Sequence, residues 1–389
     1  MATFEPASPL IAGVVSFKGL VSIFGTTGIN GTTAETDIGI MTIPSYNDWV
    51  SRLNSSLYQT TGPTGDWANE WWAVYNYLQY GGICLVGGTG ATGDYYGGVG
   101  GVLTASNTPL HNKSISTFDV VFDAGNTYSA QAAYSIATTR RDCIAYIGNY
   151  KSITGIPLGA NYSGQTGDFG ITLGITGTEY VSFVAGRKKF LSDVGQSTGV
   201  VFTTNLSPDV AGCAARAARS DNVWTTPAGK IRGRILGVIS LEQNFTTSDS
   251  DYLYAGKVNP VKTFPGEGTF LMGNRTSYTS TGVLGSINVV AMLAYLKKEL
   301  LSIAVSLLFE LNTDEVRQQF TTSAVPILES IKAGNGISSY TIICDSTNNT
   351  ATTMAANKLI IDIRLKPTAT AEIINITIIN SDTSEILQG

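Results

Sequence analysis

Residues 207–229 read SPDVAGCAARAARSDNVWTTPAG and residues 258–276 read VNPVKTFPGEGTFLMGNRT. In the first segment, the small side chains of Val210–Ala218 predict a helix that other elements can approach closely. Val223–Thr225 follows as an exposed-looking loop, and Pro227 comes directly after it. The first segment therefore predicts a loop, a small-residue helix and a second loop.

The second segment has turn and strand signals. Asn259 and Pro260 predict a turn, and strand-like residues lie on each side of Gly266 and Gly268. None of these residue types in this order suggests catalysis, so the pattern favours a structural role.

The composition limits the class of protein. A chain of 389 residues can form two or three domains with cores of their own. Charged residues make up 14% of the chain, against roughly 25% in an average soluble domain. This favours a surface covered by copies of itself, and it is equally typical of a β-rich adhesin. The net charge of −5 argues against a nucleic-acid-binding surface.

Three further features of the sequence concern where in the cell the protein is found. Cys84, Cys143, Cys213 and Cys344 lie far apart with no CxxC motif, and three of them stand among apolar or small residues, which predicts buried free thiols in a reducing compartment. Residues 1–25 lack the pattern of a signal peptide, so we do not expect export by that route. The apolar run from 289 to 309 contains Lys297–Glu299, and such charges favour a core helix over a membrane span.

The first two thirds of the chain have α/β patterning. A helix followed by the strand Ile83–Val86 is predicted within residues 66–86. Phe118–Phe122, Tyr128–Arg140 and Cys143–Ile147 then predict a strand, a helix and a strand, which form a βαβ unit. We therefore assign residues 21–268 to an α/β domain.

Residues 269–366 have a different order, which predicts a small α+β domain. Two helices are predicted at Ile287–Leu308 and Val316–Lys332. Asn312 with Glu315 resembles a capping box at the start of the second helix. Ser323 with Pro326 predicts a break within that helix.

The last predicted strand has a half-buried pattern. Leu359, Ile361 and Ile363 alternate with Asp362 and Arg364, and Pro367 ends the strand.

Both termini contain β-prone runs. Leu10–Phe17 is flanked by prolines and a glycine, and Ile374, Ile376 and Ile378 share one face of residues 371–379. An unpaired apolar strand is an aggregation hazard, so each run either folds onto its own sheet or pairs with another chain. We assign residues 1–20 and 367–389 to terminal arms.

The sequence offers little chemistry for catalysis. His111 is the single histidine, and a GxSxG elbow, a P-loop and a dinucleotide fingerprint are all missing from the sequence. We expect no enzyme activity, no cofactor and no metal site.

The quoted segments resemble the contractile tail sheath proteins of myovirus-type bacteriophages and related contractile injection systems. The resemblance continues through Phe309–Asn312, Cys344–Asp345 and Asn348–Asn349. Asn222 and Asn274 depart from the family pattern. The matching residues of the two segments are Ala211, Gly212, Arg216, Val223, Trp224, Pro227, Ala228, Gly229, Leu253, Val258, Asn259, Pro260, Gly266, Gly268, Gly273, Arg275 and Thr276.

This resemblance implies a subtilisin-like α/β sheath domain, a C-terminal α+β domain and arms that exchange strands between subunits. The implied exchange residues are Leu10, Val14, Phe17, Leu359, Ile361, Ile363, Ile374, Ile376 and Ile378. The motif residues with an implied structural role are Trp224, Pro227, Asn259, Pro260, Gly273 and Arg275.

The implied function is mechanical. Subunits would stack as hexameric rings around an inner tail tube, between a baseplate and a tail terminator, and contract to drive the tube through the target envelope. The resemblance implies a place in the phage tail of the virion, assembly in the host cytoplasm, and no direct contact with nucleic acid or membrane. The alternative is an adhesin that binds host glycan through Trp67, Trp71 and Trp72; an α/β hydrolase is a third possibility.

Overall fold

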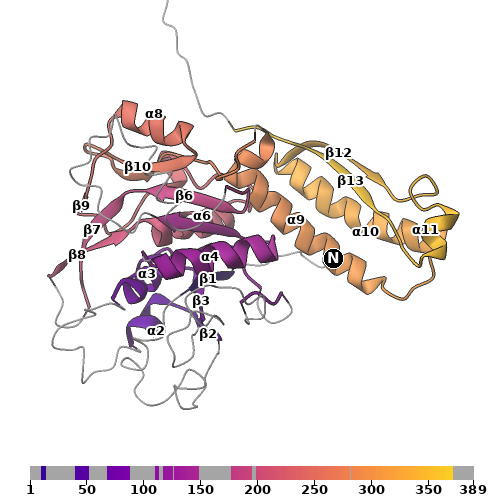
Figure 1. Ribbon diagram of the computed structural model, residues 1–389, viewed down its shortest axis with the longest axis horizontal. Helices are drawn as coiled ribbons and strands as arrows, with labels where there is room; N and C mark the ends of the chain where they lie inside the picture. The colour runs from indigo at the N-terminus through magenta and orange to yellow at the C-terminus, as the bar shows by residue number, and fades with distance from the viewer. Residues whose placement is uncertain are drawn as a thin grey trace, which may run out of the picture.

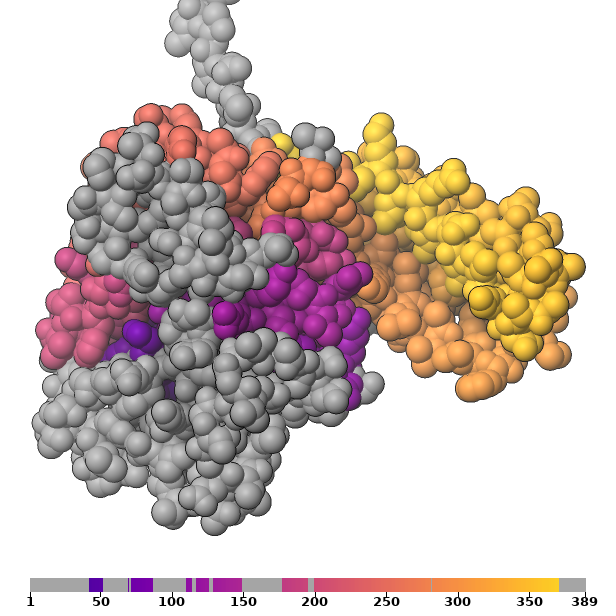
Figure 2. Space-filling view, in the orientation of Figure 1, coloured from indigo at the N-terminus to yellow at the C-terminus, as the bar shows by residue number. Residues whose placement is uncertain are grey.

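The computed structural model describes residues 10–14, 40–51, 68–87, 110–113, 117–125, 127–148, 177–194, 199–280 and 282–370. These residues form an α/β body and a C-terminal domain that projects from one side of it (Figure 1). The space-filling view shows the same projection as a separate orange and yellow lobe (Figure 2).

The body is built on an eight-stranded sheet. Six neighbouring strands run parallel, and β2 and β11 pair antiparallel at the two edges. In spatial order the strands are β11 (Gly268–Leu271), β10 (Val258–Phe264), β6 (Val181–Ala185), β5 (Ile144–Gly148), β4 (Val120–Phe122), β1 (Leu10–Val14), β3 (Ile83–Gly87) and β2 (Ile40–Ile43).

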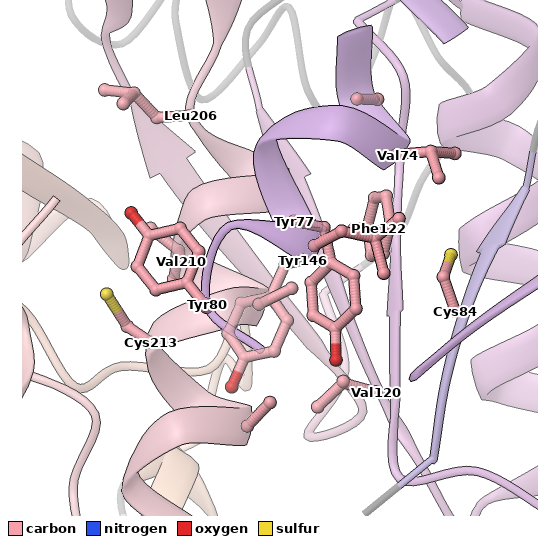
Figure 3. Packing of buried hydrophobic residues seen from close by; sticks show 14 of the residues in the cluster. Val74, Tyr77, Tyr80, Cys84, Val120, Phe122, Tyr146, Leu206, Val210 and Cys213 are labelled. Atoms are coloured by element: carbon pink, nitrogen blue, oxygen red, sulfur yellow. The ribbon is translucent and has the colours of Figure 1, made fainter. Parts of the chain in front are cut away.

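Helices cover both faces of this sheet. α3 (Ala68–Leu78) and α6 (Ser207–Ser220) pack on one face, and α4 (Thr127–Arg140) and α8 (Thr247–Ala255) on the other. β5 serves both layers, because its successive side chains point to opposite faces. On the α3 and α6 side, Tyr77 stacks on Phe122 with ring centroids 5.1 Å apart (Figure 3).

Smaller elements complete the body. A three-stranded antiparallel sheet has the order β8 (Val201–Asn205), β7 (Arg187–Leu191) and β9 (Ser240–Leu241). The short helices are α2 (Tyr46–Ser51) and α7 (Gly229–Arg232).

The predicted βαβ unit is confirmed as β4, α4 and β5, and the predicted small-residue helix lies within α6. The turn predicted at Asn259 and Pro260 is wrong, because both residues lie in β10 and pair with Val184 and Ala185 of β6. A proline fits there because the pairing of β10 with β11 begins one residue later, at Val261.

Two predicted boundaries differ from the structure. Leu10–Val14, assigned to the N-terminal arm, forms β1 between β3 and β4 of its own chain. A position between two parallel strands gives the backbone groups of this segment strand partners on both sides, which satisfies them within the interior of the sheet. The other boundary, at residue 268, falls at the start of β11, so the sheet continues to Leu271.

The C-terminal domain contains two long helices and a two-stranded antiparallel sheet. Its elements are η3 (Val283–Gly285), α9 (Ile287–Ser306), α10 (Asp314–Ala333), β12 (Ile337–Ile343), α11 (Ala351–Ala355) and β13 (Asp362–Pro367). A small core joins the helices to β12, and its fully buried members are Met292, Leu296, Leu328, Ile331 and Ile337.

Two details of α10 differ from the sequence prediction. The N-cap is Thr313, whose side chain accepts a hydrogen bond from the Val316 N–H, so the capping box predicted from Asn312 is wrong. The helix also continues through Pro326. Pro326 is exposed, so water can satisfy the backbone carbonyl that proline leaves without a helical donor.

Candidate functional site

The C-terminal domain has an apolar groove between α9, α10 and β13. Its volume is about 420 Å³, and α9 supplies most of its lining. We call it the α9 groove. Its lining residues are Leu293, Leu296, Lys297, Leu300, Leu301, Ala304, Phe320, Ile361, Ile363 and Leu365.

The groove exists because two strands cover only part of the helical layer. β12 packs along α10, and among the described residues β13 pairs only with β12. Along β13, Asp362 and Arg364 are exposed, whereas Ile363 and Leu365 turn toward the helices. A further strand beside β13 would cover the groove and would continue the sheet.

The predicted exchange residues fall into three groups. Ile361 and Ile363 line the α9 groove, and Leu359 is partly buried just before β13. Leu10 and Val14 lie in β1. Phe17, Ile374, Ile376 and Ile378 lie outside the described residues.

Trp224 joins the body to the C-terminal domain. Its indole N–H donates a 2.8 Å hydrogen bond to the Gly334 carbonyl at the end of α10. A Cβ on Gly334 would lie 2.6 Å from the indole ring, so this approach requires glycine. The loop around Trp224 is therefore partly buried, although the sequence suggested an exposed one.

A second cluster fixes the turn after β11. The Asn259 side chain donates to the Arg275 carbonyl at 2.7 Å, and its Oδ1 accepts from the Arg275 N–H at 2.7 Å. A Cβ on Gly273 would lie 2.5 Å from Asn259 Oδ1. Pro260 accepts a hydrogen bond from Met272, and Pro227 is buried. These residues bond to the protein backbone and pack in its interior.

The sequence did not reveal two features of this region. Lys298 of α9 lies 2.6 Å from Asp119 in the body and also donates to the Phe118 carbonyl. The α9 lining of the groove was missed as well, because its apolar run is typical of a fully covered helix. The spacing of apolar residues alone could not show which part of α9 is left uncovered by the described strands.

The buried polar groups of the body serve packing. Asp123 accepts hydrogen bonds from Ser207, Asn205 and the Gly148 N–H, and burial raises its pKa to about 6. His111 lies 3.1 Å from Ser135, and burial lowers its pKa to about 4. Ser207 is fully buried, so a substrate cannot reach its hydroxyl.

No group of three or more His, Cys, Asp or Glu side chains is placed to hold a metal ion in the part of the chain that the structure describes. Among the helices that the structure describes, none is long and apolar enough to cross a membrane. Trp71 and Trp72, the described candidates for glycan binding, are both 1% exposed, which does not favour the adhesin alternative.

The fold and the α9 groove define a mixed α/β protein with an appended α+β domain, in which the described residues leave one strand edge and one helix face uncovered. Two family models match this chain in succession. The phage tail sheath protein central domain matches residues 120–277, and the phage tail sheath C-terminal domain matches residues 279–379. The chain belongs to the phage tail sheath protein family.

Relatives of known identity agree with this assignment. The tail sheath protein of Enterobacteria phage T4 is 32% identical over 178 residues, which cover 46% of this chain and 27% of the relative. The tail sheath protein of Vibrio phage KVP40 is 31% identical over 178 residues, with 46% and 26% covered. The similarity therefore spans about a quarter of each of these longer relatives.

Solved structures share the whole fold. A sheath complex of the extracellular contractile injection system PVC, in the contracted state, has a TM-score of 0.71 at 14% identity, with 97% of this chain and 93% of that chain covered. The anti-feeding prophage helical sheath in the contracted state has a TM-score of 0.70 at 13% identity, covering 98% and 96%. Because the sequence identities are only 14% and 13%, these two comparisons show that the fold is similar and nothing more.

Proposed function

We propose that this chain is the structural subunit of a contractile tail sheath. Copies would stack as hexameric rings around an inner tail tube and contract to drive that tube through a target envelope. The α9 groove carries the proposal, together with the edge of β13 that no strand of the described residues pairs with, because a strand of another chain can complete such a site. The low content of charged residues also supports a surface covered by other copies.

The C-terminal arm, residues 367–389, is the proposed donor. Its apolar face contains Ile374, Ile376 and Ile378, and this face suits a groove lined by leucine and isoleucine side chains. An added strand would form backbone hydrogen bonds with β13, each of which stabilises the contact by about 1 kcal/mol. The short linker after Pro367 would act as the hinge. Because β1 lies in its own sheet, we propose no donor role for Leu10 and Val14.

The energy for contraction would be stored during assembly. A stretched sheath protected by a kinetic barrier can release free energy when its subunits form larger contacts, and this requires no nucleotide. Trp224 and the Lys298–Asp119 ion pair hold the two domains of a subunit together. We therefore expect each subunit to move nearly as a rigid body.

The proposed partners are further copies of the chain, an inner tube protein, a baseplate and a tail terminator. The proposed place of action is a phage tail or a related injection device, after assembly in the host cytoplasm. A subtilisin-like topology for the central domain is part of the same proposal.

Electron microscopy of the purified chain tests the proposed function. We expect hollow tubes of uniform width with helical striations, in the contracted form because the inner tube is absent. Discrete small particles at every concentration would contradict self-assembly.

A truncation tests the role of the arm. Deleting residues 370–389 should leave a folded monomer that no longer polymerises, since the donor strand is lost. Replacing Leu301, which lines the groove and is 54% exposed, with glutamine should weaken assembly without unfolding the chain. The control for the Leu301 variant is Leu191→Gln, because Leu191 lies in the body and is 52% exposed. Normal tubes from the truncated chain would contradict strand exchange.

A further inference from the structure

The loop between α9 and α10 lies at the outer end of the C-terminal domain (Figure 1). Apolar side chains of this loop and of the end of α9 are exposed. Phe309 is fully exposed, and Leu311 is 77% exposed. Leu308 and Val305 extend this surface and are more than half exposed. We call these four residues the tip. Exposed apolar side chains that gather in one place mark interaction sites more often than isolated ones do.

Hydrogen bonds hold the tip in one conformation. Phe309 has a φ of 71°, in the left-handed region that bulky residues rarely adopt. Asn312 Nδ2 donates to the Lys358 carbonyl at 2.9 Å, and Arg317 Nη1 donates to the Asn312 carbonyl at 3.2 Å. The loop is therefore tied to α10 and to the segment before β13. An aromatic side chain on a fixed loop loses little conformational entropy when it binds a partner.

Three acidic residues lie within or next to the tip in the sequence, and we call them the acidic rim. Glu310, Asp314 and Glu315 are all exposed. The nearby cation Arg317 is buried and pairs with Asp314, so it does not neutralise the whole rim. The tip thus has an apolar centre and an acidic rim. A complementary partner needs an exposed apolar residue with cations around it.

The chain itself has such a surface on α7 and the residues that follow. Ile231 is 86% exposed, and Lys230, Arg232 and Arg234 lie near it in the sequence. We call these four residues the basic surface. Lys230 pairs with Glu267 and Arg232 pairs with Asp221, each at 2.5 Å, so the charge of this surface toward a partner relies on the exposed Arg234. Leu271 N–H donates to the Gly233 carbonyl at 2.7 Å, which fixes this segment against β11.

The tip and the basic surface cannot meet within one subunit. α9 starts against the body, where the Ile287 N–H donates to the Asn274 carbonyl at 3.0 Å. The tip follows the far end of this helix of 20 residues, and a helix of that length spans about 30 Å. The basic surface stays on the body beside β11. A contact between the two surfaces therefore requires two molecules.

We propose that the tip of one copy docks on the basic surface of a second copy. The two surfaces differ, so the contact is heterologous and repeats from copy to copy instead of closing into a dimer. This inference rests on the proposed assembly function, and it adds a contact that uses neither terminal arm.

Cross-linking tests the contact directly. The variant with Phe309→Cys and Ile231→Cys should give a ladder of disulfide-linked oligomers after mild oxidation of assembled protein. Each single variant should stay monomeric on the same non-reducing gel, because Cys84, Cys143 and Cys213 are buried and the partly exposed Cys344 is replaced by serine in every variant. The matched control pairs Phe309→Cys with Leu191→Cys, which is also exposed, and should give no ladder. An equal ladder from that control would overturn the proposal.

Charge exchange supplies a second test. Glu310→Arg or Arg234→Glu alone should raise the protein concentration needed for assembly at least about tenfold, and the double variant should restore it. Additive losses would contradict the contact. If the double-cysteine variant forms normal tubes but no cross-link between positions 309 and 231, the docking contact is refuted and the proposed function still stands. A wild-type chain that stays monomeric at every concentration would refute both.

Discussion

Gly273 shows how one residue can fix the turn between the two domains. A side chain there would meet Asn259 at three atoms, at 2.5, 2.8 and 2.9 Å, and the last of these is the backbone Cα. Because Asn259 bonds both the N–H and the carbonyl of Arg275, it cannot move away without breaking these bonds.

Gly273→Ala should therefore lower the free energy of unfolding by about 2–3 kcal/mol, through the clash and the broken hydrogen bonds. Urea unfolding followed by circular dichroism measures this loss. Gly285→Ala is the matched control, because its Cβ would have an ordinary 3.9 Å contact with Arg275. Equal effects of the two substitutions would show that the clash at Asn259 does not determine the loss.

His111 and Asp123 make opposite contributions to stability as the pH falls. Burial, together with the charge of Arg140, lowers the pKa of His111 to about 4. As the pH falls through 6.5, the His111 side chain of the unfolded chain binds a proton, whereas that of the folded chain does not. The folded state therefore loses stability as the pH falls below 6.5. Burial raises the pKa of Asp123 to about 6, so protonation of Asp123 adds stability as the pH falls through 6.

Substitutions separate the two contributions. Between pH 7 and pH 5, His111→Asn should gain about 1–2 kcal/mol of stability relative to the wild type, and Asp123→Asn should lose about 1 kcal/mol. Urea unfolding at pH 7, 6 and 5 measures both. Parallel pH profiles for the wild type and the two variants would contradict the shifted pKa values.

At the scale of the element, Pro326 interrupts the hydrogen bonding of α10. The residue is exposed and lies in the middle of a helix of 20 residues. Pro326→Ala should raise the free energy of unfolding by about 1–2 kcal/mol. The alanine restores a helical N–H, which stabilises the fold. This gain is larger than the stabilisation that is lost because alanine leaves the unfolded chain more conformational freedom than proline does. Chemical unfolding measures the change, and Ser323→Ala is the control on the same exposed helix. A less stable Pro326→Ala variant would mean that the proline shapes a bend that packing requires.

Periodicity predicted most of the elements themselves. The βαβ unit, α6 and the order of the C-terminal elements follow from local patterns of apolar residues. The helix break at Pro326 and the turn at Asn259 were wrong because turn-forming residues were weighed without their tertiary partners. Pairing with β6 holds Asn259 and Pro260 in a strand, and that partner is more than 70 residues away, as the 77-residue separation of Asn259 and Ser182 shows.

At the scale of the whole molecule, Trp224 and Lys298 connect the two domains. Trp224→Ala should remove the hydrogen bond to Gly334 and the packing against Gly336, a loss of about 3 kcal/mol. The C-terminal domain should then unfold separately, so calorimetry of unassembled protein should show two transitions in place of one. Trp224→Phe, which keeps most of the packing, is the control. A single transition in Trp224→Ala would contradict the role of this contact in coupling the domains.

The sequence by itself determined the local elements, the small-residue helix and the motif residues that resemble the sheath family, because these depend on neighbouring residues and on short spacings. The tertiary structure alone decided that Leu10–Val14 lies inside its own sheet and that Trp224 bonds a residue 110 positions away. It also decided that no strand from the described part of the chain covers the groove of α9. Those outcomes depend on contacts between distant segments, where the favourable pairing is chosen by backbone hydrogen bonding and packing that no local pattern contains.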